Sequence, residues 1–247
     1  MTTTKTTSDV CASCGGTGWR LVSSEGGGLV KRCECADVAR RRRLLDRAGI
    51  PARYRHCTLA GFELWNPDDP TLGRARRAVQ EFVDLYPHVD RGLLLMGPVG
   101  SGKTHLAVAA LQELIEAKGT TGRFADFTSL VLNIQMTFDG EGSSRELLQP
   151  LTETQVLVLD ELGAGKTTPW VMDLLYYLVN TRYLEGRTTL FTTNYSDFAA
   201  GAGQDSLTDR VSARIRSRLF EMCRRVELRG GDYRRERLAH SSERRTP

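Results

Sequence analysis

Two hydrophobic patterns take turns along most of the chain. Short, nearly continuous apolar runs predict strands that are buried on both faces, and apolar residues recurring every three or four positions predict amphipathic helices. The predicted strands are 92–96, 122–127, 155–159 and 188–192. The predicted helices are 103–117, 128–138, 170–184 and 207–223. This alternation predicts an α/β fold in which helices flank a parallel sheet.

The N-terminal part of the chain lacks this alternation. Residues 11–35 are rich in glycine and cysteine, and residues 36–48 predict a short basic helix that ends at Gly49 and Pro51. The chain is therefore expected to divide into five parts. These are a disordered tail at 1–10, a cysteine knuckle at 11–35, a basic linker helix at 36–49, an α/β domain at 50–236 and a second tail at 237–247.

Composition narrows the class of protein. The 247 residues have room for one α/β domain and a small module, and 40% of them are hydrophobic, which is enough for a packed core. No apolar run approaches the roughly 18 residues of a membrane span, so we expect a cytoplasmic protein without a membrane partner. The net charge of +4 conceals arginine clusters at 40–43 and 210–237. Such clusters suit nucleic acid or an acidic protein surface, and are also typical of a solvated face.

The strongest chemical signal lies between the first predicted strand and the helix that follows it. The residues that fit the pattern G-x-x-x-x-G-K-[ST] are Gly97, Pro98, Val99, Gly100, Ser101, Gly102, Lys103 and Thr104. Backbone amides of such a loop surround phosphate oxygens, the lysine contacts the β and γ phosphates, and the threonine holds Mg²⁺. The sequence therefore predicts that the chain binds ATP with Mg²⁺.

Two carboxylates and an amide follow the next predicted strands. Asp160 is expected to support the Mg²⁺ shell, and Glu161 is expected to orient or deprotonate the attacking water. Asn194 comes at the carboxyl end of a strand, where ligands of parallel sheets bind. It is a candidate sensor of the γ phosphate, although an asparagine in this place can also simply form a turn.

The predicted helix 207–223 carries an apolar stripe and a row of cations. The stripe consists of Leu207, Val211, Ile215 and Leu219. The row consists of Arg210, Arg214 and Arg218. In a monomer such a row is a solvated edge, whereas in an oligomer it can supply an arginine finger to the next subunit.

Taken in order, these motifs resemble those of the AAA+ ATPases of the bacterial helicase-loader type, DnaC and DnaI, and of the related IstB transposition helpers. The resemblance covers roughly residues 50–236. It rests loosely on 50–54 with Phe62, and strongly on 97–104, 159–163, 191–194, 214–219 and 232–234.

The resemblance implies a nucleotide-switched homo-oligomer that engages a replicative helicase and single-stranded DNA. It also implies roles by position. Asn194 is the sensor residue, Arg218 is the arginine finger, and Arg214 and Arg234 are further candidates for phosphate sensing. Tyr54 and Phe62 are candidates to enclose the adenine, or else belong to the core.

Four of the six cysteines lie close to the N-terminus, as Cys11, Cys14, Cys33 and Cys35. A C-x-x-C pair followed by a C-x-C pair predicts a tetrahedral Zn²⁺ site, and a redox-active thiol pair is the alternative. A zinc module in this place resembles that of DnaI-type loaders, where it serves protein contact. Cys57 and Cys223 are expected to be small buried residues.

The leading functional hypothesis is an ATP-dependent helicase loader, because the cysteine-rich N-terminal part favours a loader over an IstB-like transposition helper. A binding adaptor with negligible ATP turnover and a small-molecule kinase are alternatives from other classes. The joint presence of Glu161, Asn194 and Arg218 disfavours the adaptor. No feature of an acceptor site supports the kinase.

Overall fold

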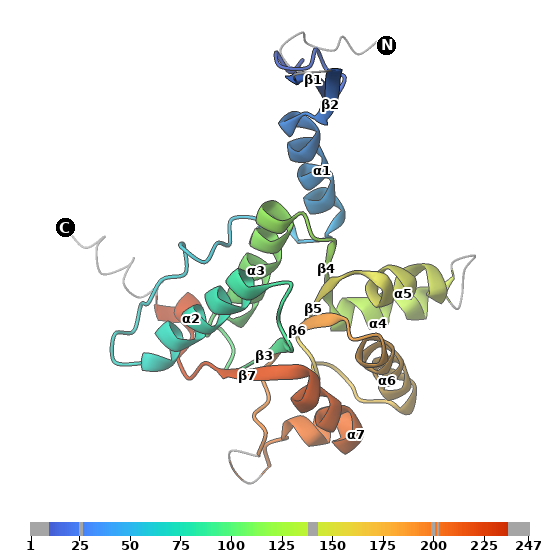
Figure 1. Cartoon of the computed structure of the whole chain (residues 1–247). Helices are drawn as coiled ribbons and strands as arrows, with labels where there is room; N and C mark the ends of the chain where they lie inside the picture. The colour runs from blue at the N-terminus through green and yellow to red at the C-terminus, as the bar shows by residue number, and fades with distance from the viewer. Residues whose placement is uncertain (1–9, 25–26, 138–142, 199–200, 202, 237–247) are drawn as a thin grey trace, which may run out of the picture.

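The computed structural model describes residues 10–24, 27–137, 143–198, 201 and 203–236. In this part of the chain, five parallel strands form one sheet with the order β4-β5-β6-β3-β7 (Figure 1). The strands are β3 (Gly92–Met96), β4 (Gly122–Asp126), β5 (Val156–Asp160), β6 (Thr188–Thr193) and β7 (Cys223–Glu227). The predicted α/β fold with a parallel sheet is therefore confirmed.

Helices cover both faces of the sheet. Alternate residues of a strand point to opposite faces, and in the central strands both sets of residues are apolar. Leu93 belongs to a buried cluster with α2 (Pro70–Leu85) and α3 (Lys103–Lys118). Leu94 belongs to a second cluster on the opposite face. The helices of that second cluster are α4 (Phe127–Met136), α5 (Ser144–Glu153), α6 (Pro169–Leu184) and α7 (Leu207–Met222). Both faces of the central strands are thus buried, as their apolar sequence predicts.

The predicted strands and helices agree with the structure to within two residues at each end. Phe127 begins α4 instead of ending β4, because the side chain of Asp126 accepts a hydrogen bond from the backbone N of Ser129 and caps the helix. Cys223 begins β7 instead of ending α7. Phe138, the last residue of one predicted helix, lies outside the described residues.

Helices α2 and α5 and strand β7 are absent from the sequence predictions. Helix α2 does carry a start signal, since Asp69 accepts from the backbone N of Thr71 at 2.8 Å and Pro70 is the first helical residue. Helix α5 contains Pro150, which argues against a helix. Strand β7 follows α7 directly, and its buried residues Cys223 and Val226 continue a helical spacing. Periodicity alone could not separate these two elements.

The N-terminal part forms a hairpin and a helix that extend away from the sheet (Figure 1). Strands β1 (Trp19–Ser24) and β2 (Gly27–Arg32) pair in antiparallel fashion, and α1 (Glu34–Arg47) follows them. The helix begins two residues before the predicted start, so Cys35 lies in its first turn. The four arginines at 40–43 are exposed along it. Among the described residues, no helix has the length and apolar character to cross a membrane.

A buried arginine ties α5 and α6 to the sheet. Arg182 is 1% exposed, and its Nε donates to the hydroxyl of Thr189 at 2.8 Å. Its Nη1 donates to the carbonyl oxygens of Leu151 and Thr154, at 2.7 and 2.9 Å, and its Nη2 donates to that of Thr188 at 2.6 Å. Burial lowers its pKa to about 9. The side chain therefore satisfies carbonyl groups at the end of α5 and beside two strands.

We expect Arg182→Met to lower the free energy of unfolding by about 3 kcal/mol, because buried carbonyl groups lose their donors. Denaturant titration measures this loss. The matched control is Arg224→Met, since Arg224 forms an exposed ion pair with Glu81 at 2.8 Å that contributes less than about 1 kcal/mol. Equal losses in the two variants would contradict this account of Arg182.

Candidate nucleotide site

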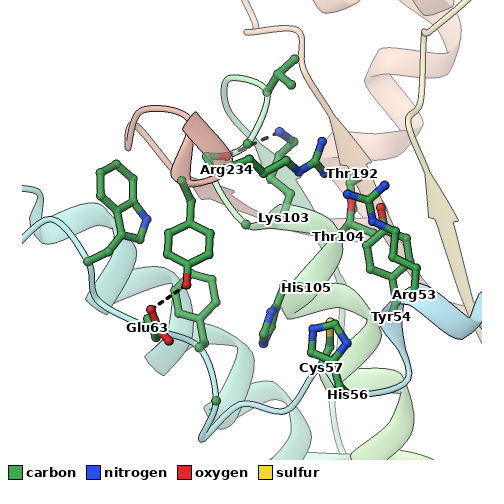
Figure 2. Close-up of a pocket in the computed structure, with 18 of the residues that line it drawn as sticks. Arg53, Tyr54, His56, Cys57, Glu63, Lys103, Thr104, His105, Thr192 and Arg234 are labelled. Atoms are coloured by element: carbon green, nitrogen blue, oxygen red, sulfur yellow. Dashed lines mark hydrogen bonds between the residues drawn. The ribbon is translucent and has the colours of Figure 1, made fainter. Parts of the chain in front are cut away.

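The carboxyl ends of the central strands meet at a cavity of about 530 Å³ (Figure 2). This is the edge of a parallel sheet at which ligands of α/β proteins bind. Of the predicted site residues, those that line the cavity are Val99, Gly100, Ser101, Gly102, Lys103, Thr104, Glu161 and Asn194. Tyr54, Phe62 and Arg234 also line it. The fold therefore brings residues from several separate segments to one place.

The loop between β3 and α3 has a backbone that only glycine adopts easily. Gly100 and Gly102 have positive φ angles of 78° and 98°. A Cβ atom on Gly102 would lie 2.6 Å from Cε2 of Phe62, and a Cβ atom on Gly100 would lie 2.0 Å from Oδ1 of Asp232. Both positions thus require glycine for conformation and for space. Such a loop at a helix N-terminus turns its amides toward an anion.

Lys103 is 6% exposed at the start of α3. Its Nζ donates to the carbonyl oxygens of Gly97 and Pro98, at 2.9 and 2.7 Å. Burial lowers the pKa of Lys103 to about 8, although the carboxylates of Asp160 and Glu161 act in the opposite direction. The loop therefore encloses a cation that is only partly neutralised, as a phosphate site requires.

Asp160 lies behind this loop, 4% exposed at the end of β5. The hydroxyl of Thr104 donates to its two carboxylate oxygens at 3.0 and 3.2 Å, and the hydroxyl of Thr192 donates to Oδ1 at 2.5 Å. Burial raises the pKa of Asp160, and the hydrogen bonds from Thr192 and Thr104 oppose that effect. A hydroxyl and a carboxylate in contact are the oxygen donors that Mg²⁺ prefers.

Glu161 turns the other way and faces the cavity. Its backbone adopts a left-handed φ of 57°, and its N donates to the hydroxyl of Thr192 at 3.0 Å. A non-glycine residue in this conformation costs about 1–2 kcal/mol, so neighbouring contacts must hold it. Consecutive carboxylates are thereby separated into a buried one and an exposed one. Asn194 is likewise exposed to the cavity from the end of β6.

The C-terminal segment covers the phosphate loop, which the sequence patterns did not predict. The backbone N of Tyr233 donates to the carbonyl oxygen of Gly100 at 3.3 Å, and its hydroxyl donates to Glu63 at 2.6 Å. The ring of Trp65 lies 6.1 Å from that of Tyr233, centroid to centroid. Arg234 follows and extends into the cavity (Figure 2). Trp65, Tyr233 and Arg234 come from segments without a phosphate-binding motif. Of their places in the site, only that of Arg234 is predicted, through the family resemblance at 232–234.

Arg214 and Arg218 lie outside this cavity. The guanidinium carbon of Arg218 lies 4.7 Å from the ring centroid of Tyr176 and 5.6 Å from that of Tyr183, both on α6. That of Arg214 lies 5.4 Å from the Tyr176 ring. A backbone break at Ser212, with φ 69°, separates both from Arg210. The predicted row of three arginines is therefore interrupted, whereas the predicted apolar stripe is buried throughout.

Comparison with known proteins identifies the family of this chain. Residues 36–241 match the family described as IstB-like ATP binding protein. The chain belongs to this family. A curated relative is the replicative helicase loader DnaC of Escherichia coli (strain K12), 25% identical over 72% of this chain and 68% of DnaC. Another is the insertion sequence IS21 putative ATP-binding protein of Pseudomonas aeruginosa, 29% identical over 75% of this chain and 69% of that protein.

The relatives differ in length, and the chain spans 61% of protein YqaM of Bacillus subtilis, to which it is 24% identical. Among solved structures, the crystal structure of the DnaC helicase loader matches with a TM-score of 0.62 and 30% identity, over 72% of this chain and 100% of that one. The crystal structure of DnaI has a TM-score of 0.59. The family match and the DnaC matches confirm the predicted resemblance, so the chain is an AAA+ P-loop ATP-binding protein of the DnaC and IstB group, and the DnaI structure, at 24% identity, shows the same fold.

The cysteine cluster precedes the family match, which begins at residue 36. The sulfur atoms of Cys11, Cys14, Cys33 and Cys35 lie within 4.8 Å of one another. Two of the distances are 3.8 and 3.4 Å, and sulfurs at ~2.3 Å from one zinc lie about 3.8 Å apart. Burial raises the pKa of Cys14, but hydrogen bonds from Cys35 and the amide of Gly18 outweigh burial and lower it to about 6. Cys57 and Cys223 are buried elsewhere, as predicted.

The residues at the strand ends fit a nucleotide with Mg²⁺. Lys103 and the loop amides would hold phosphates, and Thr104 with Asp160 would hold the metal ion, which neutralises phosphate charge when bound. The buried carboxylate of Asp160 accepts from two hydroxyl groups, but no cation of the described residues lies within ion-pair distance of it. That donor set suits Mg²⁺.

ATP affinity should depend on pH through Lys103. Its pKa of about 8 in the free chain should rise when phosphate oxygens surround the ammonium, so binding takes up a proton above that pH. Affinity should be independent of this group below pH 7 and should fall by up to about tenfold per pH unit above pH 8. Equilibrium titration from pH 6.5 to 9.5 measures the effect. Lys103→Arg, which stays charged, should remove the dependence, and a flat native profile would contradict the assignment.

Proposed function

We propose that this chain is an ATPase that acts as a loader, engaging a replicative helicase and single-stranded DNA during replication initiation. It works in the cytoplasm as a homo-oligomer. Residues 50–236 are the AAA+ ATPase domain, 11–35 the zinc knuckle and 36–49 the basic linker helix, between tails at 1–10 and 237–247. A Zn²⁺ ion in the cysteine cluster would hold the N-terminal hairpin to α1.

One observation carries the ATPase part of the proposal. Lys103, Glu161 and Asn194 line a single cavity, whereas Arg218 lies outside it on α7. In this proposal, the phosphate loop holds the nucleotide, Asp160 supports the metal ion, and Glu161 positions and deprotonates water. Among the described residues, no hydroxyl group donates to the exposed Glu161 carboxylate, in contrast to Asp160. Arg218 completes the site of the neighbouring subunit as an arginine finger.

The N-terminal module favours a loader over a transposition helper. The ATPase domain is common to relatives of both kinds, including the IS21 ATP-binding protein. The cysteine cluster lies before the IstB-like match and so adds a separate module to that domain. The hairpin exposes Leu21 by 81% and Leu29 by 64%, and α1, which follows it in the chain, exposes its arginines at 40–43. Such a surface suits contact with another protein. An IstB-like transposition helper is the second candidate, supported by the family match itself.

Turnover of ATP tests the shared site. We expect Glu161→Gln and Arg218→Ala each to lower the rate of ATP hydrolysis by about 100-fold or more, with and without single-stranded DNA. Mixing the two variants should restore about a quarter of native turnover, since random assembly completes about one interface in four. Arg224→Ala, on the exposed surface, should have native turnover. No recovery on mixing would contradict Arg218 acting in trans, and native turnover in both variants would favour the adaptor.

Metal analysis tests the knuckle. The purified chain should contain about one zinc ion, and Cys14→Ser or a strong chelator should remove it. Cys57→Ser and Cys223→Ser should retain the metal, because both thiols are buried apart from the cluster. ATP hydrolysis should persist without zinc. Native chain free of metal, with Cys11 and Cys14 joined as a disulfide, would instead support the redox alternative.

A further inference from the structure

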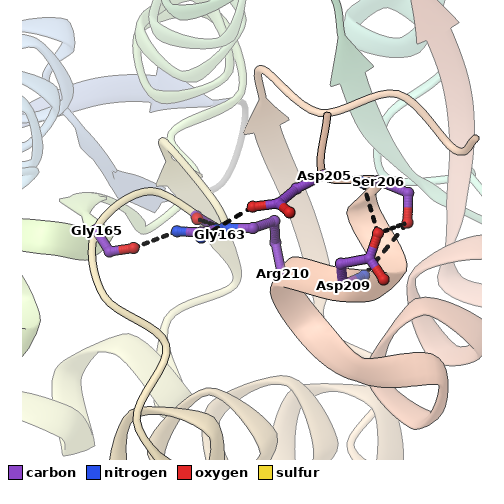
Figure 3. Close-up of polar contacts among 6 residues, drawn as sticks. All are labelled: Gly163, Gly165, Asp205, Ser206, Asp209 and Arg210. Atoms are coloured by element: carbon purple, nitrogen blue, oxygen red, sulfur yellow. Dashed lines mark hydrogen bonds and ion pairs between the residues drawn. The ribbon is translucent and has the colours of Figure 1, made fainter. Parts of the chain in front are cut away.

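Arg210 contacts the loop that carries Glu161 away from β5, and the proposed mechanism assigns it no role. Its Nε donates to the carbonyl oxygen of Gly163 at 2.8 Å, and its Nη2 donates to that of Gly165 (Figure 3). Both acceptors follow Glu161 within four residues. One planar guanidinium thus donates to two carbonyl groups of this loop, a geometry that lysine cannot reproduce.

The same side chain contacts the end of β6. Its guanidinium carbon lies 5.1 Å from the ring centroid of Tyr195, the residue after Asn194. A Cβ atom on Gly163 would lie 3.0 Å from Cβ of Arg210 and 3.2 Å from the Tyr195 ring. Gly163 is therefore held between the two side chains. The hydroxyl of Thr193 also donates to the carbonyl oxygen of Leu162 at 2.8 Å, so hydrogen bonds join the two strand ends as well.

The base of Arg210 is itself fixed. Ser206 and Asp209 form a capping box at the start of α7, with Ser206 Oγ donating to Asp209 at 2.6 Å (Figure 3). The Arg210 side chain is 17% exposed, and its Nη1 lies 3.3 Å from the carboxylate of Asp205. The break at Ser212 separates this first turn from the part of α7 that bears Arg218.

Glu161 needs such an anchor. Its left-handed φ of 57° is unfavourable for a residue with a side chain, so the conformation depends on contacts around it. Thr192 accepts from the backbone N of Glu161 and of Leu162, at 3.0 and 2.8 Å, and so fixes the start of the loop. Arg210 holds the carbonyl groups farther along the loop. If the contacts of Arg210 are lost, we expect the loop after Glu161 to relax toward a right-handed conformation and to carry the Glu161 carboxylate away from the cavity.

We propose that Arg210 is a positioning residue for ATP hydrolysis, which holds the Glu161 carboxylate in the cavity and joins it to the β6 end that bears Asn194. The inference rests on the proposed function, since it gives Glu161 its orientation for the attacking water. It concerns the subunit's own nucleotide site, whereas Arg218 serves the neighbouring one.

Steady-state kinetics provides the first test. Arg210→Ala should lower kcat for ATP by on the order of tenfold to a hundredfold and leave ATP affinity within about threefold of native, because the phosphate loop is untouched. Arg210→Lys should stay close to Arg210→Ala, since an ammonium cannot hold both carbonyl groups. The control is Arg216→Ala on the same helix, where Arg216 pairs with Asp197 at 2.5 Å and stacks on Phe220, and it should keep native kcat.

Mixed assemblies separate positioning from general damage. Arg210→Ala subunits mixed with Arg218→Ala subunits should recover turnover, because the latter keep an intact Glu161 loop and receive Arg218 from the former. Arg210→Ala mixed with Glu161→Gln should not recover, since both are defective in their own sites. The opposite pattern, recovery with Glu161→Gln only, would overturn the proposal and place the effect of Arg210 on the Arg218 part of α7.

Three further results would be decisive. Native kcat in Arg210→Ala overturns the proposal, and so does a loss of ATP affinity equal to the loss of kcat. If the Glu161→Gln and Arg218→Ala mixture itself fails to recover, the shared site of the proposed function falls. The kcat and affinity of Arg210→Ala then decide the role of Arg210 alone, with a selective fall in kcat supporting it.

Discussion

A carboxylate buried where parallel strands end must be satisfied by hydroxyl groups, and this requirement connects the parts of the nucleotide site. Asp160 receives hydrogen bonds from Thr104 on α3 and from Thr192 on β6. The hydroxyl of Thr192 also accepts from the backbone of Glu161. A single buried group therefore sets the spacing of the phosphate loop, the acidic pair and the strand that leads to Asn194. A misplaced hydroxyl would leave Asp160 unsatisfied in the core, at a cost of about 1–3 kcal/mol.

This connection explains how two adjacent carboxylates have opposite environments. The backbone turns sharply after Asp160, so Asp160 stays with the hydroxyls and Glu161 faces the cavity. Burial raises the pKa of Asp160 because it disfavours the charged carboxylate. A metal ion or a hydroxyl donor beside Asp160 offsets this cost. Glu161 keeps contact with the cavity and is available to water. Pairs of acidic groups with different surroundings commonly divide the work of a hydrolytic site.

The parts of the site that could be predicted are those with a local pattern. The phosphate loop is a continuous motif between a strand and a helix, and Asp160 and Asn194 follow apolar runs whose ends must meet at one edge of a parallel sheet. Trp65 and Tyr233 have no such pattern, because they reach the cavity by contacts between segments about 170 residues apart. The contact of Arg210 with Gly163 could not be predicted. The apolar spacing continues across the break at Ser212, so the sequence predicts one straight helix with Arg210 in line with Arg214 and Arg218. The roles of the phosphate loop, Asp160 and Glu161 are predictions from local motifs, whereas those of Arg214, Arg218 and Arg234 are predictions from the family resemblance.

The ATP-binding domain does not by itself distinguish a loader from a transposition helper, and the N-terminal module is the part that could. The most direct measurement is the ATP-dependent assembly of the replicative helicase from the same genome onto closed circular single-stranded DNA, followed by gel filtration of the circles. A loader predicts that the helicase joins the circles only when this chain and ATP are both present. Equal assembly without the chain, or no association between the chain and the helicase, would contradict it.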